Sequence, residues 1–365
     1  MAVVTFVLPG LTDRPSGGYK VVYAYAGYLT RAGHDVVICH AFFPSGRHLA
    51  GGDLFRRLFD RYRQERVARR AASTAPDRPS WYPVDPAIQI RNFARLSPAS
   101  VPHSDVIVAT AVHTAPLVSA AAQRQGAKGV YFIQHFETWD APTAFVEATW
   151  RLPLKRVVIA PWLAEKGREL GVETTLVMNA VDPSEFHSGP EIAQRPTSLV
   201  ALVSSTPWKR TDLVVSVMRS LSARLPGFRG ATFGTCPRPA GLPDTVAHFQ
   251  EPSRDELAQL YADAKVYLCA SDAEGWHLPP SEAMLAGAAV VSTDIGGVRA
   301  YADETAVFAP VGDADALSEA VLSLLQDPER CQALASKGQQ LIAARTPADA
   351  AREFARAVLG LDGKA

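Results

Sequence analysis

The sequence has few cysteines, no excess of charge of either sign and no long apolar run. Its four cysteines, Cys39, Cys236, Cys269 and Cys331, stand far apart among 365 residues and form no Cys-x-x-Cys pair. This spacing excludes the common zinc motifs. Three of the four lie in or beside apolar strand-like segments, so we expect reduced thiols in the core.

The balance of charge excludes a general attraction to polyanions. The sequence has 37 basic and 37 acidic residues, so nothing draws the whole chain toward nucleic acid or an anionic membrane. No apolar run approaches the ~20 residues that span a bilayer. The N-terminus begins with an apolar segment that has no basic residues, which favours a first strand over a signal peptide. We therefore expect a cytoplasmic protein.

Short apolar segments alternate with amphipathic helices through both halves of the chain. A length of 365 residues exceeds one comfortable core, so two domains are expected. The expected strands are residues 3–8, 33–38, 105–110, 130–134, 156–160 and 175–178 in the first half, and 199–203, 231–234, 265–269 and 288–292 in the second. Strand–helix–strand units of this length are parallel and right-handed. The pattern predicts an α/β protein made of two Rossmann-like doubly wound domains.

The stretch from Glu274 to Met284, with the sequence EGWHLPPSEAM, contains the main candidate functional residues. It follows a buried strand, and its two prolines open a helix because the first helical turn does not need their missing N–H groups. Glu274 is expected on the loop, and Glu282, eight positions later, in the first helical turn. The free N–H groups and positive dipole end of that helix favour an anion site between the two carboxylates.

This stretch resembles the Glu-x7-Glu signature of retaining GT-B glycosyltransferases, particularly family 4. The signature usually has the sequence EGFGLPPxEAM, and Trp276 and His277 replace its aromatic residue and second glycine. The resemblance implies two Rossmann-like domains facing across a cleft. It assigns Glu274 to the donor sugar and Glu282 to the nucleotide ribose.

The resemblance assigns further residues to the same cleft. The loop of Gly275 and Trp276 and the backbone of His277 and Leu278 would hold the donor diphosphate, as would Lys209. The family arginine expected five or six residues before Lys209 is absent, since Val203 and Ser204 stand there. Arg210 is the alternative cation.

Two glycine pairs and one histidine complete the set of candidates. Gly17 and Gly18 precede a helix expected over 19–31 and would approach the donor phosphate or the acceptor, with Gly18 assigned to the diphosphate. Gly296 and Gly297 are expected to form a sharp loop facing the cleft. His135 stands at the carboxyl end of an expected strand, where ligands of open α/β sheets bind, and the family has a histidine beside the reacting sugar. Glu137 and Asp140 are secondary candidates nearby.

The domain boundaries follow from the same resemblance. The acceptor-side domain covers residues 1–182, a polar linker 183–197 and the nucleotide-sugar-binding domain 198–345. The last helix, within 346–365, is expected to cross back to the first domain. The chain has one Asp-x-Asp, at Asp313 and Asp315, which we expect to cap a helix. No metal site and no cofactor beyond the nucleotide-sugar are expected.

One segment stands apart in charge. Residues 53–70 contain seven arginines and three acidic residues, a net charge of +4, with apolar residues on one helical face. Such a helix fits peripheral contact with a membrane, or a solvated helix packed on its own domain, which we favour.

The predicted activity is therefore retaining, metal-independent transfer of a sugar from a nucleotide diphosphate-sugar to a hydroxyl acceptor, soluble rather than lipid-linked. Two alternatives stay open. The first is a catalytically impaired nucleotide-binding protein, and the second is a nucleotide-sugar epimerase or hydrolase on the same fold.

Overall fold

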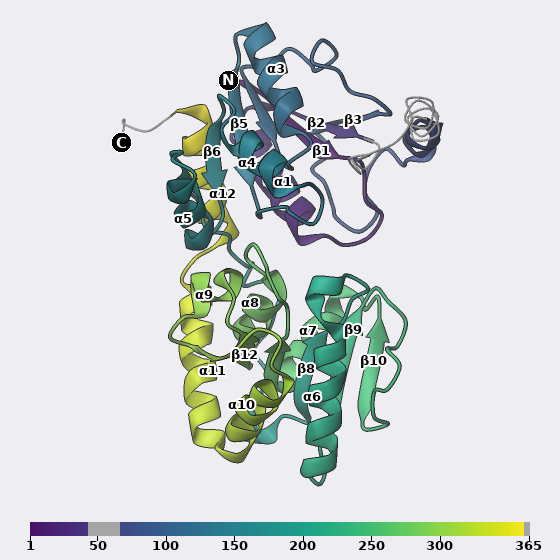
Figure 1. Ribbon diagram of the computed structural model, residues 1–365, viewed down its shortest axis with the longest axis vertical. Coiled ribbons are helices and arrows are strands. Elements are labelled where there is room, and N and C mark those ends of the chain that lie inside the picture. Colours follow the sequence, from purple (N-terminus) through teal and green to yellow (C-terminus); the bar gives the residue numbers. More distant parts are fainter. Residues whose placement is uncertain (43–65, 361–365) are drawn as a thin grey trace. The chain divides into compact units, whose positions relative to one another are not determined.

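The computed structural model describes residues 1–42 and 66–360. The chain forms two compact units, one made of Met1–Asn179 and Ala348–Ala365 and the other of Ala180–Pro347 (Figure 1). Among the described residues, no helix is long and apolar enough to cross a membrane. Residues 43–65 lie outside the described part, and with them most of the arginine-rich segment; residues 66–74 are helical.

The first unit is built on a seven-stranded parallel sheet in the order β3-β2-β1-β4-β5-β6-β7. Its strands are β1 (Val3–Pro9), β2 (Asp35–Ala41), β3 (Gln89–Phe93), β4 (Val106–Ala109), β5 (Lys128–Ile133), β6 (Lys155–Val158) and β7 (Thr175–Leu176). Its helices are α1 (Gly17–Arg31), α3 (Ala115–Gln125), α4 (Thr143–Trp150), α5 (Pro161–Glu169) and α12 (Pro347–Leu359). The central strands are apolar on both faces because helices cover both sides of such a sheet.

Helix α12, from the end of the chain, packs into this first unit. Phe354 is fully buried, and its ring centroid lies 4.7 Å from that of Tyr25 and 5.0 Å from that of Phe132. It also stacks on Phe6 at 6.0 Å. The aromatic contacts explain why the last helix leaves the sequence-adjacent second unit: its apolar face completes the core of the first.

The second unit has a six-stranded parallel sheet in the order β10-β9-β8-β11-β12-β13. Its strands are β8 (Thr197–Leu202), β9 (Gly230–Gly234), β10 (Val246–Gln250), β11 (Ala264–Cys269), β12 (Ala289–Thr293) and β13 (Ala306–Ala309). Its helices are α6 (Thr211–Arg224), α7 (Arg254–Asp263), α8 (Leu278–Leu285), α9 (Gly296–Ala302), α10 (Ala314–Gln326) and α11 (Pro328–Ala343), with short 3-10 turns η1 (Ile192–Gln194) and η2 (Pro207–Lys209). Both sheets are doubly wound, so the prediction of two Rossmann-like units is confirmed.

Two local expectations differ from the structure. No strand is predicted between residues 38 and 105, yet β3 lies there and pairs with β2, with Ile90 opposite Ile38. Segment 183–197, predicted as a linker, packs on the second unit. Its Ile192 is buried, and the buried guanidinium of Arg195 donates to the carbonyl oxygens of Pro190, Ala264 and Ala286. Polarity suggested an exposed connection, but these hydrogen bonds satisfy the buried charge.

Candidate functional site

The candidate site of the second unit lies at the topological switch point of its sheet. Strands β8 and β11 are neighbours, and the chain proceeds outward from them in opposite directions. Loops 203–210 and 270–277 therefore diverge beyond the carboxyl ends of these strands, which leaves room for a ligand there. The backbone N–H of Asp272 donates to the carbonyl of Trp208 at 2.8 Å and ties the two loops together.

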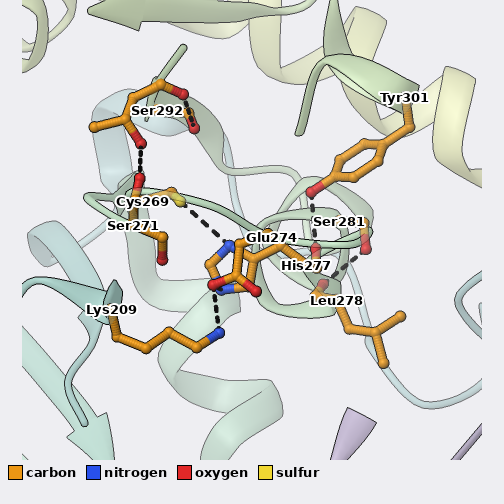
Figure 2. A network of polar contacts seen from close by, with 10 residues as sticks. Lys209, Cys269, Ser271, Glu274, His277, Leu278, Ser281, Ser292 and Tyr301 are labelled. Atoms are coloured by element: carbon orange, nitrogen blue, oxygen red, sulfur yellow. Dashed lines mark hydrogen bonds and ion pairs between the residues drawn. The ribbon is translucent and has the colours of Figure 1, made fainter. Parts of the chain in front are cut away.

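An ion pair joins the same two loops. Lys209, the last residue of η2, places its Nζ 2.5 Å from Oε1 of Glu274, and their side chains are 20% and 10% exposed (Figure 2). Burial alone would raise the pKa of Glu274, but the charge and hydrogen bond of Lys209, with a hydrogen bond from the Ser271 side chain, outweigh burial and hold the pKa below its ordinary value. Glu274 is therefore an ionised, nearly buried carboxylate at neutral pH.

His277 lies beside this pair and caps α8. Its backbone is left-handed, with φ of 65°, and its carbonyl accepts a hydrogen bond of 2.9 Å from the hydroxyl of Tyr301. The imidazole lies between Cys269, with Sγ 3.2 Å from Nδ1, and Glu274, with Oε1 3.8 Å from Nε2 (Figure 2). Burial lowers the pKa of His277 to about 3, so the ring is neutral.

Helix α9 packs closely against the backbone of Glu274. Gly296 and Gly297 form the first turn of this helix, so the expectation of a sharp loop is wrong. A Cβ at Gly297 would stand 2.6 Å from the carbonyl oxygen of Glu274 and 2.8 Å from its Cβ. Glycine is therefore required at this position for the close approach of helix and loop, a reason that the sequence alone does not show.

Glu282 is the fifth residue of α8, not a first-turn residue as predicted, because the helix begins at Leu278, before the two prolines. It is 7% exposed, and its Oε2 accepts a hydrogen bond of 3.2 Å from the hydroxyl of Tyr261. Since the prolines lack N–H groups, the donors at this helix start are the amides of His277 and Leu278. The Trp276 side chain is buried against Tyr301, with 4.7 Å between ring centroids.

Arg210, the alternative cation, is already paired. Its Nη1 lies 3.0 Å from Oδ1 of Asp272 and its Nη2 2.8 Å from Oδ2 of Asp212. Two carboxylates thus share one guanidinium, and Lys209 is the cation that contacts Glu274. The structure brings together Lys209, Glu274, His277 and Leu278, and it directs Arg210 to a neighbouring pair of aspartates.

The first unit has its own group of candidates beyond β5. The ring of His135 lies edge-on to Trp139 at 4.3 Å and to Trp162 at 5.4 Å between centroids. Gly17 and Gly18 form the start of α1 instead of the loop before it, and the side chain of Gln134 donates to the carbonyl of Gly18 at 3.1 Å. A side chain at position 18 would crowd Gln134, since its Cβ would lie 3.3 Å from Nε2.

Glu137, a secondary candidate in the sequence, has the most perturbed pKa of the carboxyl groups that the structure describes in this unit. Its Oε2 accepts a hydrogen bond of 2.5 Å from the backbone N–H of Val112, just beyond β4. Burial, reinforced by the charge of Asp140, raises the pKa of Glu137 to about 8 against that hydrogen bond. His113 follows Val112 in the sequence, and its Nε2 lies 3.3 Å from Oδ2 of Asp140.

The acidic pair at residues 313–315 has the structural role predicted for it. Asp313 caps α10, and its side chain accepts a hydrogen bond of 2.8 Å from the N–H of Ala316. Within residues 1–42 and 66–360, no three histidine, cysteine, aspartate or glutamate side chains are grouped so that they could hold a metal ion.

The comparisons with known proteins agree with this architecture. Among solved structures, the chain is similar to HepE from Anabaena in complex with UDP and glucose (TM-score 0.71, 15% identity, 99% of this chain and 100% of that one). It is also similar to sucrose-phosphate synthase from Thermosynechococcus elongatus (TM-score 0.71, 15% identity, 99% of both chains) and to S. aureus TarM with UDP bound (TM-score 0.68, 9% identity, 98% and 100%). These similarities define the fold as GT-B.

The sequence comparisons add the class of protein. Residues 203–341, most of the second unit, match the family model described as Glycosyl transferases group 1. A comparison with curated protein sequences finds no match. The matched domain and the GT-B fold together support a glycosyltransferase.

Proposed function

We propose that this protein is a retaining, metal-independent hexosyltransferase that moves a sugar from a nucleotide diphosphate-sugar to a hydroxyl acceptor. The observation that carries the proposal is the contact between Lys209 and Glu274 at the switch point, beside the start of α8. One loop contributes a cation for a leaving diphosphate, and the other contributes an ionised carboxylate for a sugar that gains positive charge. Transfer of a glycosyl group needs both kinds of charge stabilisation.

Each remaining residue has a part in this proposal. The amides of His277 and Leu278 and the dipole of α8 add to Lys209 in stabilising the diphosphate as it leaves. Glu282 binds the ribose hydroxyls, and Tyr261 orients its carboxylate. The family resemblance assigns His135 of the first unit to the reacting sugar. Lysine and backbone amides would then do the work that a metal ion does in other transferases.

Two of the similar structures named above contain UDP, which makes uridine nucleotides the first probes to test. A thermal-shift panel of UDP, GDP and ADP identifies the base, because a ligand at 100 times its Kd stabilises by about 2.7 kcal/mol. The matching nucleotide-sugars are then offered with simple hydroxyl acceptors. We expect turnover that survives excess EDTA and a product whose anomeric configuration, followed by NMR, is retained. Activity lost to EDTA and restored by Mg²⁺, or an inverted product, would contradict the proposal.

Arg210 favours a second candidate function. Because Asp212 and Asp272 already occupy its guanidinium, and the family arginine is absent, the diphosphate has one cation fewer. A nucleotide-binding protein without turnover would stabilise on addition of a nucleoside diphosphate and form no glycoside with any acceptor. An epimerase or hydrolase would consume the nucleotide-sugar without an acceptor, so the same assays distinguish all three.

The acceptor and the location of the protein remain proposals. We favour a soluble carbohydrate acceptor and a cytoplasmic protein over a lipid-linked acceptor reached by peripheral membrane contact. Co-sedimentation with anionic vesicles tests the alternative: salt-sensitive binding, lost when arginines of segment 53–70 become glutamates, would favour the lipid route, since each arginine near such a surface contributes ~1 kcal/mol.

A further inference from the structure

His277 occupies a strained and buried position that a glycine would fill more easily. It has φ of 65°, one of three positive values among the described non-glycine residues, and its side chain is 3% exposed. A side chain here must tolerate an unfavourable backbone conformation and bury two ring nitrogens away from water. Such a combination persists when the surrounding structure holds it in place, and it gathers at functional sites.

The two contacts of the ring define its tautomer. Cys269 is fully buried, and burial raises the pKa of its thiol, so the sulfur carries a proton. The distance of 3.2 Å between Sγ and Nδ1 allows the thiol to donate this proton to the ring, with Nδ1 as the acceptor. The remaining proton of the neutral ring is then on Nε2, and Nε2–H faces the carboxylate of Glu274. The opposite tautomer would place a lone pair against that negative charge.

Besides the hydrogen bond from the Ser271 side chain, Glu274 has two cationic or donor neighbours at different distances. Lys209 is in contact at 2.5 Å, whereas Nε2 of His277 stands 3.8 Å away, beyond hydrogen-bond length. If a diphosphate draws Lys209 toward itself, the nearly buried carboxylate keeps the Ser271 hydrogen bond but loses its ion-pair partner, and a buried charge without such a partner is strongly unfavourable. A shift of about 1 Å brings Glu274 within hydrogen-bond reach of Nε2–H.

We propose that His277 is a positioning residue for Glu274: its Nε2–H, oriented by the Cys269 thiol, becomes the partner of the carboxylate when a donor diphosphate engages Lys209. This inference rests on the proposed function and deepens it. The histidine keeps Glu274 ionised and aimed at the sugar without adding a second positive charge. Loss of that support misplaces the carboxylate, and a displacement of about 1 Å at a reacting centre can lower turnover by about a hundredfold.

The test compares nucleotide and nucleotide-sugar binding in matched variants. The variants are His277→Gly, which suits the left-handed backbone, Cys269→Ala, and Cys269→Ser, which restores a donor to Nδ1. Cys331→Ala removes an equally buried sulfur of the same unit, at the carbonyl of Lys265. Calorimetry with UDP, GDP and ADP and with UDP-glucose, GDP-mannose and ADP-glucose gives the affinities, and melting curves check the fold.

The expected loss falls on the sugar. His277→Gly should lower kcat by about tenfold to a hundredfold and weaken the nucleotide-sugar several times more than the nucleoside diphosphate. Cys269→Ala should show part of this loss, Cys269→Ser should recover it, and Cys331→Ala should show none. A folded His277→Gly protein with unchanged kcat, or one that loses both affinities equally, would overturn the positioning role.

A second measurement does not depend on any nucleotide. With ¹⁵N-labelled histidine, NMR should show His277 neutral at pH 7 and protonated at Nε2, and Cys269→Ala should shift the proton toward Nδ1. A wild-type ring protonated at Nδ1 overturns the inference even if the enzyme is active. If wild-type protein binds no probe and transfers no sugar while the ring shows the expected tautomer, it is the proposed function that fails.

Discussion

The two units end their central strands in loops of opposite electrostatic character. In the second unit, a cation lies against a nearly buried carboxylate, and Glu274 is ionised. In the first, Glu137 accepts one backbone N–H, and burial with the nearby Asp140 raises its pKa to about 8, so it is mostly protonated at neutral pH. Both units use the same doubly wound sheet, and both place a carboxyl group beyond its strands.

This difference shows that the common fold determines where the site lies, beyond the ends of the strands, whereas the residues of the loops determine its charge. Lys209 reaches Glu274 because η2 and loop 270–277 are tied by the hydrogen bond between Asp272 and Trp208. His135 of the first unit is instead surrounded by tryptophan rings. A charged leaving group suits the ion pair of the second unit. A neutral, hydroxyl-rich ligand with apolar ring faces suits the tryptophan rings of the first unit.

The largest effect should come from removing the charge of the second unit. Glu274→Gln keeps the shape of the side chain but loses its negative charge, so kcat should fall on the order of 10²–10³-fold. Affinity for the nucleoside diphosphate should hold or rise, because Lys209 is released from its ion pair. Glu319→Gln, at an exposed site of the same unit, is the control. Near-normal turnover would place the reacting centre elsewhere.

A smaller effect is expected on the first unit. His135→Ala should lower kcat by about tenfold to a hundredfold and change donor affinity little, since groups that act near the reacting carbon affect the transition state most. His103→Ala, at an exposed histidine of the same unit, should match wild type. If the variant loses donor affinity and keeps kcat, His135 binds the ground state and the contrast between units is weaker.

Glu282 tests the binding part of the second unit separately. Charge-assisted hydrogen bonds to two ribose hydroxyls are worth ~1.5–3 kcal/mol, so Glu282→Ala should weaken nucleoside diphosphate binding by roughly tenfold to a hundredfold. Tyr261→Phe removes the hydroxyl that orients the carboxylate and should produce a smaller loss. Unchanged affinity in calorimetry would remove Glu282 from the ribose site.

Gly297 tests whether the support of Glu274 is steric. Gly297→Ala places a Cβ 2.6 Å from the carbonyl oxygen of Glu274, and overpacking of this kind typically costs about 1–3 kcal/mol. The melting temperature should fall by roughly 2–4 °C per kcal/mol, and kcat should fall with it. Gly296→Ala, one exposed position earlier, should leave the melting temperature unchanged. Equal melting temperatures for both variants would refute the close-approach argument.

The effect that depends on pH belongs to the first unit. The pKa of Glu137 is raised in the folded protein from 4.5 to about 8, so its contribution to stability is present below pH 4.5 and is lost as pH rises through about 8. Glu137→Gln imitates the protonated carboxyl. In melting curves at pH 5, 7 and 9, the melting temperature of the variant relative to wild type should therefore rise with pH. Glu165→Gln, on the surface, should show no such change. A constant difference would mean that Glu137 titrates normally.

Many of the local elements of the second unit can be predicted from its sequence. Apolar runs at the spacing of strand–helix–strand units predict both doubly wound sheets, because parallel strands buried on both faces need continuous apolar residues. Ser253 and Glu256 form a capping box at the start of α7, a pattern of neighbouring residues whose two hydrogen bonds are both present. The string from Glu274 to Met284 predicts a loop and helix that carry two carboxylates. These features are local, so neighbours in sequence suffice to specify them.

Only the tertiary structure decides the partners of those carboxylates. Lys209 and Glu274 are 65 residues apart and meet because β8 and β11 are neighbours at the switch point. Cys269 and Tyr301 contact His277, and Gly297 admits the backbone of Glu274. Glu137 becomes a protonated carboxyl because burial and the charge of Asp140 outweigh its hydrogen bond from Val112. Sequence determines which groups the chain carries and which local elements hold them. The distances and the loss of water that set charge, tautomer and pKa arise from packing between distant segments, because electrostatic energies depend on separation and on exposure to solvent.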